Sequence, residues 1–223
     1  MTSRFDLNQL KNRISASVLV LFLACVFVFP SQAYAKDIPN ALPQLNTFVE
    51  SVKDGDSNTL RGVYVPDVMA FAITQQPVGN PGYVSSADSV VTQFSIAAEV
   101  GNVGLLAHNT HAGAVFSSIQ QGDLIVLVYG DGHTEIFMAQ SIQQYQALDP
   151  FNPYSQFKDL ETQTTFTAEE LFNNVYRGDY HLTLQTCIEN SGNSSWGRLF
   201  IVATPAENTL NPMATFASKR HIE

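Results

Sequence analysis

Short apolar runs, most of them of strand length, recur along most of this chain and constrain its fold more than any other feature. The runs are rich in Val, Ile, Leu and aromatic residues, and Gly, Pro, Asn or Asp interrupts them. Many short strands with few helices in one domain favour a closed or nearly closed β-barrel over a βαβ architecture. Composition alone leaves a β-sandwich open. The runs lie at residues 62–73, 103–107, 124–129, 134–139, 182–187 and 199–203.

The amino-acid content supports a buried core of ordinary size. Hydrophobic residues make up 45% of the 223 positions and charged residues 14%, with 15 Phe and 8 Tyr. This apolar content can bury enough surface to offset the entropy of ordering the chain, which excludes a disordered chain. The length predicts one domain rather than two.

Local signals predict a hairpin and a first helix. Asp131-Gly132 separates two apolar runs and predicts a hairpin, because Asp-Gly supplies the positive backbone angles that a tight primed turn requires. Residues 86–98 place Val90, Val91 and other apolar residues at helical intervals, which predicts a helix there.

A second helix and a loop are predicted further along the chain. Thr167 and Glu170 form a capping box in front of an apolar pattern, so a short helix should open there and end near Gly178. Residues 149–166 are polar and contain proline, and we expect a surface loop.

The N-terminus has the three parts of an export signal. Basic residues come first, an apolar run from Val18 to Phe29 follows, and Ala33-Tyr34-Ala35 is a small-residue cleavage site. The run has 12 apolar residues, short of the ~20 that a spanning helix needs, which favours a cleaved signal with Lys36 as the first mature residue. An uncleaved N-terminal anchor is the alternative. The basic residues are Arg4, Lys11 and Arg13.

The charge balance argues against nucleic acid as a partner. The whole chain carries a formal net charge of −9. Removing residues 1–35 takes away three basic residues and one acidic residue, and leaves 8 basic against 19 acidic residues, a net charge of −11. Such a chain repels phosphate backbones, and it contains no Gly-rich phosphate loop.

The mature chain has a single cysteine, Cys187, because Cys25 lies inside the export signal. One cysteine cannot form an internal disulfide, so an exported protein keeps it either as a buried inert thiol or for its reactivity. Alternation along residues 181–187 places Cys187 on the polar face with Gln185, opposite the leucine face. Residues 188–195 have the composition of a loop, so we expect Cys187 to end its strand within reach of a cleft.

Two further groups could act with this thiol. The strand at 103–107 ends in His108, with His111 three residues later, and an imidazole can exchange a proton with a thiol. Arg198 opens the strand after the cysteine, and its permanent charge and several donors suit an oxygen that becomes negative during acyl transfer.

These residues resemble the sortase family. Thr-Leu-Gln-Thr-Cys at 183–187 matches the Thr-Leu-x-Thr-Cys motif of sortases, Arg198 matches the family's arginine on the next strand, and Ala-His-Asn at 107–109 resembles its Gly-His motif, with Ala107 where many sortases have glycine. The order His, Cys, Arg is also that of the family. The resemblance spans roughly residues 61–205.

The resemblance implies a mainly β fold, the closed eight-stranded sortase barrel, with two or three short helices. Together with the N-terminal signal, it divides the chain into residues 1–35, the signal peptide or uncleaved anchor; 36–60, a polar entry segment; 61–205, the sortase-like catalytic barrel; and 206–223, a polar C-terminal tail. The helix predicted after Thr167 would lie in the loop before the cysteine strand, which in sortases helps to shape the peptide groove.

The resemblance also implies a cysteine transpeptidase. Cys187 would attack the Thr–Gly carbonyl of a C-terminal sorting signal such as Leu-Pro-x-Thr-Gly, and the acyl group would pass to an amine or to water. His108 would be the acid and base, and Arg198 would stabilise the oxyanion. His108 is favoured over His111 because it directly follows the apolar strand.

The same resemblance extends to partners and location. The partners would be the sorting signal of exported proteins and an amine acceptor, at the extracellular or cell-surface side, with membrane contact only through an uncleaved N-terminal segment. We expect a monomer with no cofactor; calcium would suit the acidic balance but has no motif.

Other readings of these residues compete with this one. The barrel could lack turnover and serve as an exported peptide-binding or surface structural module. Cys187 could be a buried structural thiol, the more common state of a lone cysteine. Arg198 could pair with a carboxylate of the acidic surface. His108 and His111, with His133, could bind a metal, although no recognisable zinc pattern accompanies them.

Overall fold

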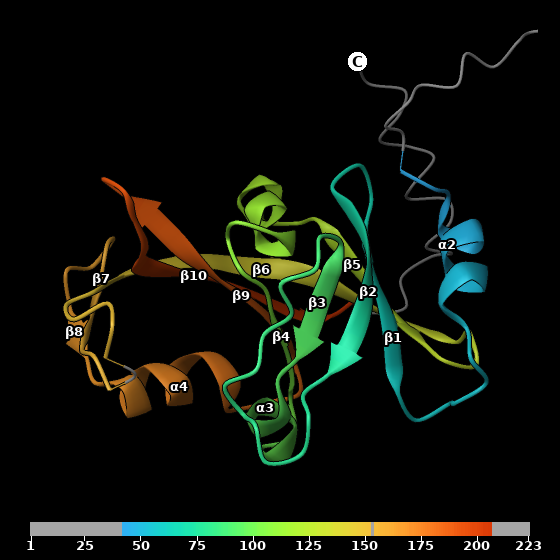
Figure 1. The fold of residues 1–223 in the computed structure, drawn as a ribbon, viewed down its shortest axis with the longest axis horizontal. Coiled ribbons are helices and arrows are strands. Elements are labelled where there is room, and N and C mark those ends of the chain that lie inside the picture. Colours follow the sequence, from blue (N-terminus) through green and yellow to red (C-terminus); the bar gives the residue numbers. More distant parts are fainter. Residues whose placement is uncertain (1–41, 153, 207–223) are drawn as a thin grey trace, which may run out of the picture. The chain divides into compact units, whose positions relative to one another are not determined.

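The structure is a computed structural model that describes residues 42–152 and 154–206 (Figure 1). The predicted signal segment, residues 1–35, and nearly all of the predicted tail lie outside the described residues. In the described ranges, no helix combines the length and the apolar character that crossing a membrane requires.

Ten strands form one sheet in the order β10-β9-β4-β3-β2-β1-β5-β6-β7-β8. An additional pairing between β10 and β6 joins the sheet back on itself, so eight strands close into a barrel while β7 and β8 extend beyond it. The pairs β2–β3 and β4–β9 are parallel and the others are antiparallel. The strands are β1 (Leu60–Val65), β2 (Met69–Gln75), β3 (Val90–Gln93), β4 (Val103–Leu106), β5 (Leu124–Tyr129), β6 (Thr134–Ala147), β7 (Phe157–Asp159), β8 (Thr165–Phe166), β9 (Leu182–Asn190) and β10 (Asn193–Pro205).

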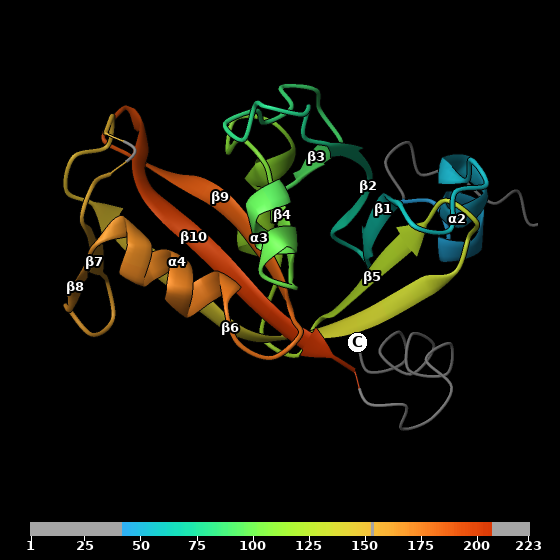
Figure 2. The ribbon, with the colours of Figure 1, turned by 90° about the horizontal axis from the view of Figure 1, so that it is seen from below.

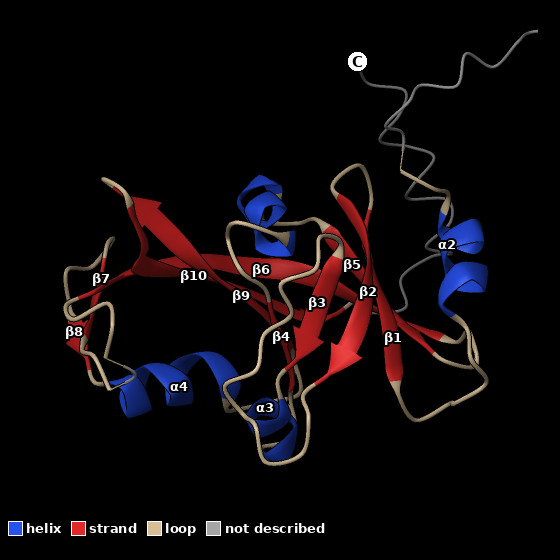
Figure 3. Ribbon diagram, viewed as in Figure 1, coloured by secondary structure: helices blue, strands red, loops and turns tan. Residues whose placement is uncertain are grey.

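The predicted fold class, a mainly β closed eight-stranded barrel with a few short helices, is confirmed by this topology. Closure pairs every barrel strand on both sides and so removes the exposed edges of an open sheet. Figure 3 shows how little of the described chain is helical. The helices are α2 (Leu45–Val52), α3 (Ser95–Glu99), the 3-10 helix η1 (Ala112–Ser118) and α4 (Ala168–Tyr176).

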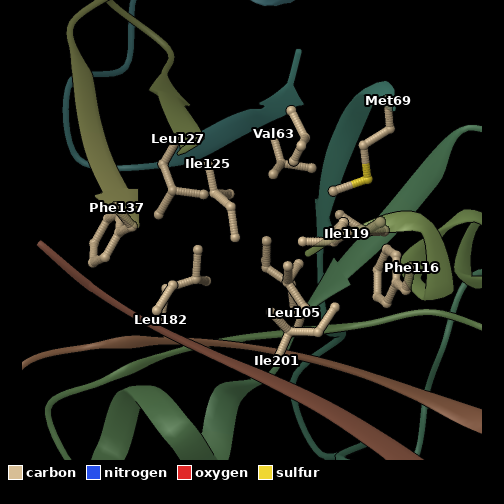
Figure 4. Packing of buried hydrophobic residues seen from close by; sticks show 14 of the residues in the cluster. Val63, Met69, Leu105, Phe116, Ile119, Ile125, Leu127, Phe137, Leu182 and Ile201 are labelled. Atoms are coloured by element: carbon tan, nitrogen blue, oxygen red, sulfur yellow. The ribbon is translucent and has the colours of Figure 1, made fainter. Parts of the chain in front are cut away.

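The inward side chains of the barrel strands make the main core. Strands from all around the barrel contribute, and the side chains of Leu105, Leu182 and Ile201 gather in Figure 4. Helix η1 adds Phe116 to the same cluster, and Ile119, which follows the helix directly, is buried there as well. The buried side of η1 therefore contributes to the barrel core, while its other side is exposed.

A second cluster lies outside the barrel, under α4. Leu171 and Tyr176 of α4 pack against Tyr145 of β6, Phe157 of β7 and Phe200 of β10. Figure 2 shows α4 running along this part of the sheet. The predicted capping box opens this helix: the Thr167 hydroxyl accepts from the Glu170 amide, and the Glu170 carboxylate accepts from the Thr167 amide.

The predicted helix over residues 86–98 is wrong. Residues 90–93 form strand β3, and only Ser95–Glu99 are helical. Val90 and Val91 pair with Ala72 and Ile73 of β2. The β-branched side chains at 90 and 91 fit a pleated surface, and pairing with the preceding strand β2 decided the outcome over local periodicity.

Two predicted loops and the type of one predicted turn also differ from expectation. The predicted surface loop 149–166 contains β7 and β8, and Phe157 in β7 is buried. Strand β9 continues past Cys187 to Asn190, so the loop predicted at 188–195 is a tight hairpin instead. The predicted hairpin between β5 and β6 is confirmed, but only Gly132 has a positive φ, of 93°. Its turn is therefore a three-residue loop with a left-handed glycine rather than a two-residue primed turn.

The polar entry segment contains an amphipathic helix. In α2, Phe48 is buried against Val126 and Val128 of β5, outside the barrel. Gly62 of β1 makes room for it, because a Cβ at Gly62 would stand 2.8 Å from the Phe48 ring. The helix is thus packed onto the barrel around Phe48, with Leu45, Val49 and Val52 partly buried beside it.

We expect Phe48→Ala to lower the free energy of unfolding by about 3 kcal/mol, because it removes a buried ring and leaves a cavity. Thr47→Ala, an exposed position on the same helix, should change it by less than about 0.5 kcal/mol. Urea unfolding of both variants measures the difference. Equal stability of the two variants would mean that α2 does not contribute to the fold.

Candidate active site

The cysteine strand β9 has two different faces. Leu182 and Leu184 lie in the barrel core with no exposed surface. The alternate residues, Gln185 and Cys187 among them, therefore face outward, and both are half-buried. Cys187 is a free cysteine outside the hydrophobic core clusters. Its sulfur is on the side of the sheet from which solvent can approach.

The two strands beside β9 bring the other predicted residues to this face. In the antiparallel pair with β10, Arg198 lies directly opposite Cys187, so the two side chains share one face. In the parallel pair with β4, Leu106 lies opposite Gln185. Beyond Leu106 the Ala107 amide still donates to the carbonyl of Gln185 at 3.1 Å, and His108 follows directly. Cys187 and Arg198 thus form one row across β9 and β10, and the chain leaves β4 toward His108 beside that row.

The two threonines of the motif hold this row in place. The hydroxyl of Thr186 donates to the carbonyl of Ala107 at 2.9 Å and ties the end of β4 to β9 just before His108. The hydroxyl of Thr183 donates to the carbonyl of Val175 at 2.6 Å and ties the last turn of α4 to the same strand. Both threonines are buried, so each bond replaces water at a polar group that burial would leave unpaired.

Gly113 permits the close approach of η1 to the cysteine strand. A Cβ at this position would collide with the Thr186 hydroxyl and stand 2.9 Å from the carbonyls of Ala107 and His108. The Gly113 amide donates to the His108 carbonyl at 2.9 Å. Gly113 therefore helps to hold the backbone of His108 in place through this hydrogen bond. Our sequence reasoning missed it, although a glycine five residues after the histidine was a visible signal.

The guanidinium of Arg198 is held by backbone carbonyls and an aromatic ring. Its Nη1 donates to the carbonyls of Ser195 at 3.0 Å and Gly197 at 2.8 Å. Its Cζ lies 5.8 Å from the centre of the Phe157 ring. Among the salt bridges of the described residues none involves Arg198, so the carboxylate pairing considered from the sequence does not occur there. The remaining N–H groups of this cation can serve an incoming oxygen.

The two histidines after β4 have different surroundings. His108 is exposed, and its ring centre lies 6.3 Å from that of His111. The Nδ1 atom of His111 lies 3.1 Å from a carboxylate oxygen of Asp88, in the connection between β2 and β3. The ring of His111 is thus engaged with a carboxylate, whereas His108 has no such partner among the described residues.

Tyrosines border the row on the α4 side. The Tyr176 hydroxyl donates to the side-chain oxygen of Gln185 at 2.6 Å. Burial raises the pKa of the Tyr176 phenol, which therefore stays protonated and keeps donating. Tyr145 lies opposite Arg198 on β6, and burial, with the charge of Asp159 as a smaller cause, raises the pKa of its phenol as well. The sequence carried no signal for either tyrosine.

The histidines do not gather into a metal site within the described ranges. No group of three or more His, Cys, Asp and Glu side chains suited to a metal occurs in residues 42–152 and 154–206. His133 stacks on Tyr129 with ring centres 4.0 Å apart, and its Nδ1 contacts Asp131. It lies in the β5–β6 hairpin, so the structure does not group it with the other two histidines.

Comparison with known proteins returns sortases among the solved structures. Listeria monocytogenes sortase A is 13% identical over 69% of this chain and 89% of its own, with a TM-score of 0.43. Actinomyces oris sortase C-1 is 11% identical over 74% and 82%, with a TM-score of 0.46. A Clostridium perfringens sortase D5 transpeptidase is 16% identical over 73% and 86%, with a TM-score of 0.43.

No protein-family profile and no curated protein matches the chain. The matched structures belong to the family that the sequence motifs resemble. Because both the identities and the TM-scores are low, the chemistry of this chain has to be argued from its own residues.

We expect Gly113→Ala to lower the free energy of unfolding by about 1–3 kcal/mol, because the added methyl group overpacks the junction of η1 with β9. The matched control is Gly82→Ala, where a Cβ would meet only the Asn80 side chain, at 3.9 Å. It should change stability by less than about 0.5 kcal/mol. Urea unfolding compares the two, and a tolerated Gly113→Ala would contradict the close approach described here.

Proposed function

We propose that this protein is an exported cysteine transpeptidase of the sortase type. It would cleave a C-terminal sorting signal through an acyl-enzyme on Cys187 and transfer the acyl group to an amine or to water. The observation that carries the proposal is the pairing of Arg198 directly opposite Cys187 on an outward face, with His108 two residues past the end of the strand on the other side.

Cys187 is the nucleophile of the proposed reaction. Its thiolate attacks the carbonyl carbon of the scissile peptide bond, and the carbonyl oxygen becomes negatively charged in the tetrahedral intermediate. The half-buried position of Cys187 supports this role, because the sulfur is near the surface yet partly shielded from water. The partial shielding strengthens any charged interaction formed around the intermediate.

Arg198 stabilises the oxygen that becomes negative. Its Nη1 is occupied by the carbonyls of Ser195 and Gly197, which fixes the plane of the guanidinium before substrate arrives. The other N–H groups can then donate to the oxyanion without reorganisation, which is the condition for effective electrostatic stabilisation.

His108 moves the protons. When the carbon–nitrogen bond breaks, the imidazolium protonates the departing amine, and a thioester to Cys187 remains. The neutral imidazole then takes a proton from the incoming amine or water as it attacks the thioester, and the carbon–sulfur bond breaks to restore the thiolate. This cycle requires no cofactor.

The substrate class and location follow from the same proposal. The partners are a peptide sorting signal and an amine acceptor, handled by a monomer at the extracellular or cell-surface side. The helix α4, tied to β9 through Thr183 and Gln185, borders the face on which the peptide would lie. The C. perfringens sortase D5 in the comparison is described as a transpeptidase.

We expect Cys187→Ala to abolish cleavage of sorting-type peptides, because no other thiol is available in the mature chain. The assay incubates the mature protein with a panel of peptides that end in such signals and an amine acceptor, and mass spectrometry detects the products. A methanethiosulfonate reagent should add its mass to Cys187 in the wild type. Normal turnover by the alanine variant would refute the proposal, and a reactive thiol without any turnover would favour the inactive binding module.

We expect Arg198→Lys to lower kcat/KM about 10²-fold, because a lysine keeps the charge but loses the fixed planar donors. Arg177→Lys is a matched control, since Arg177 is also stacked on a ring, 5.9 Å from the centre of Phe172, but is exposed at the end of α4. Steady-state kinetics on the cleaved peptide should show a near-normal control. Equal losses in the two variants would remove Arg198 from the proposed oxyanion site.

A further inference from the structure

The position of His108 raises the question of what holds it. Its backbone is fixed on the inner side, because its carbonyl accepts from the amides of His111 and Gly113. Its side chain is exposed, and the residues that follow belong to a loop. Transfer of a proton at the correct moment needs a well-defined imidazole position, so contacts on the outer side of this loop matter.

One such contact joins the histidine loop to the hairpin that carries Cys187 and Arg198. The side-chain amide of Asn109 donates to the carbonyl of Ser194 at 3.0 Å, across 85 positions of sequence. Asn109 is the residue directly after His108. Its side chain therefore connects the end of β4 to the start of β10 over the outer part of β9.

The acceptor is available because β10 is irregular there. The β9–β10 register shifts between Asn193 and Gly197, which frees the intervening residues from the regular ladder. Two consecutive carbonyls of this bulge are used by the site: Ser194 accepts from Asn109, and Ser195 accepts from Arg198. One short piece of irregular backbone thus contacts the residue next to the histidine and the arginine itself.

The opposite side of the loop has a second anchor. The Nδ1 atom of His111 lies 3.1 Å from the Asp88 carboxylate, but the Asp88 side chain is 87% exposed, so this contact is weaker than the one through Asn109. The loop 108–111 is consequently held from the β2–β3 connection on one side and from the β10 bulge on the other.

We propose that Asn109 is a positioning residue that aligns His108 with Cys187 by bonding to the β10 bulge, which at the same time orients Arg198. This inference rests on the proposed function. The β10 bulge then fixes the positions of both His108 and Arg198 relative to Cys187. Loss of the Asn109 amide leaves the substrate-binding face unchanged and loosens only the group that moves protons.

The test uses the mature protein with Asn109→Ala, and Asn109→Asp as a variant of the same shape without the donor. Both variants should lower kcat about tenfold, with KM changed less than twofold and an unchanged melting temperature. The control is Thr110→Ala, a neighbouring exposed position in the same loop, which should match the wild type. A drop in kcat limited to the aspartate variant would trace the effect to its charge and overturn the inference.

A second measurement tests the Asn109–Ser194 hydrogen bond without requiring any turnover. The NMR order parameters of the backbone amides at 108–111 should fall in Asn109→Ala and stay at the wild-type value in Thr110→Ala. Unchanged order parameters, or a looser loop with normal kcat, would overturn the inference. A wild-type protein without any acyl transfer would instead overturn the proposed function and with it the positioning role. The order parameters would then still show whether the Asn109–Ser194 hydrogen bond orders the loop.

Discussion

The parallel pairing of β4 with β9 is the constraint on which the candidate site depends. Parallel neighbours must be joined by a long crossover, and here the 75 residues between Leu106 and Leu182 form β5 to β8, η1 and α4. The pairing ends with Leu106 opposite Gln185, so the chain leaves β4 toward His108 two residues before the level of Cys187 in β9. The Thr186 hydroxyl secures this register at the Ala107 carbonyl.

Side chains alternate between the two faces of each barrel strand, so the residues that pack the core and the residues of the candidate site lie on opposite faces. Along β9 the leucines enter the closed interior, and the intervening side chains meet α4 or remain accessible. A closed barrel cannot shift its register without moving apolar groups to the outside, so the outward row is as well defined as the core. The position of Cys187 opposite Arg198 is therefore fixed by the packing of residues that take no part in the chemistry.

Several features of the fold and site were predictable because they depend on local chemistry. The capping box of Thr167 and Glu170 needs only residues three apart, and the alternation around Cys187 needs only its own strand. The helix expected at 86–98 failed, because β2 offered a parallel partner that no local pattern reveals. Gly113 and Tyr176 were missed for the same reason: each acts through a contact with β9 that appears only after folding.

The sequence by itself determined the type of chain and the chemical groups available. Strand-length apolar runs specified a β-rich core, and the motif around Cys187 marked a thiol, an imidazole and a guanidinium. Only the tertiary structure decided how these groups meet, because cross-strand register and the β10 bulge depend on backbone hydrogen bonds between segments far apart in the chain. Such bonds have the same donors and acceptors at every residue, so the sequence does not encode their pairing locally.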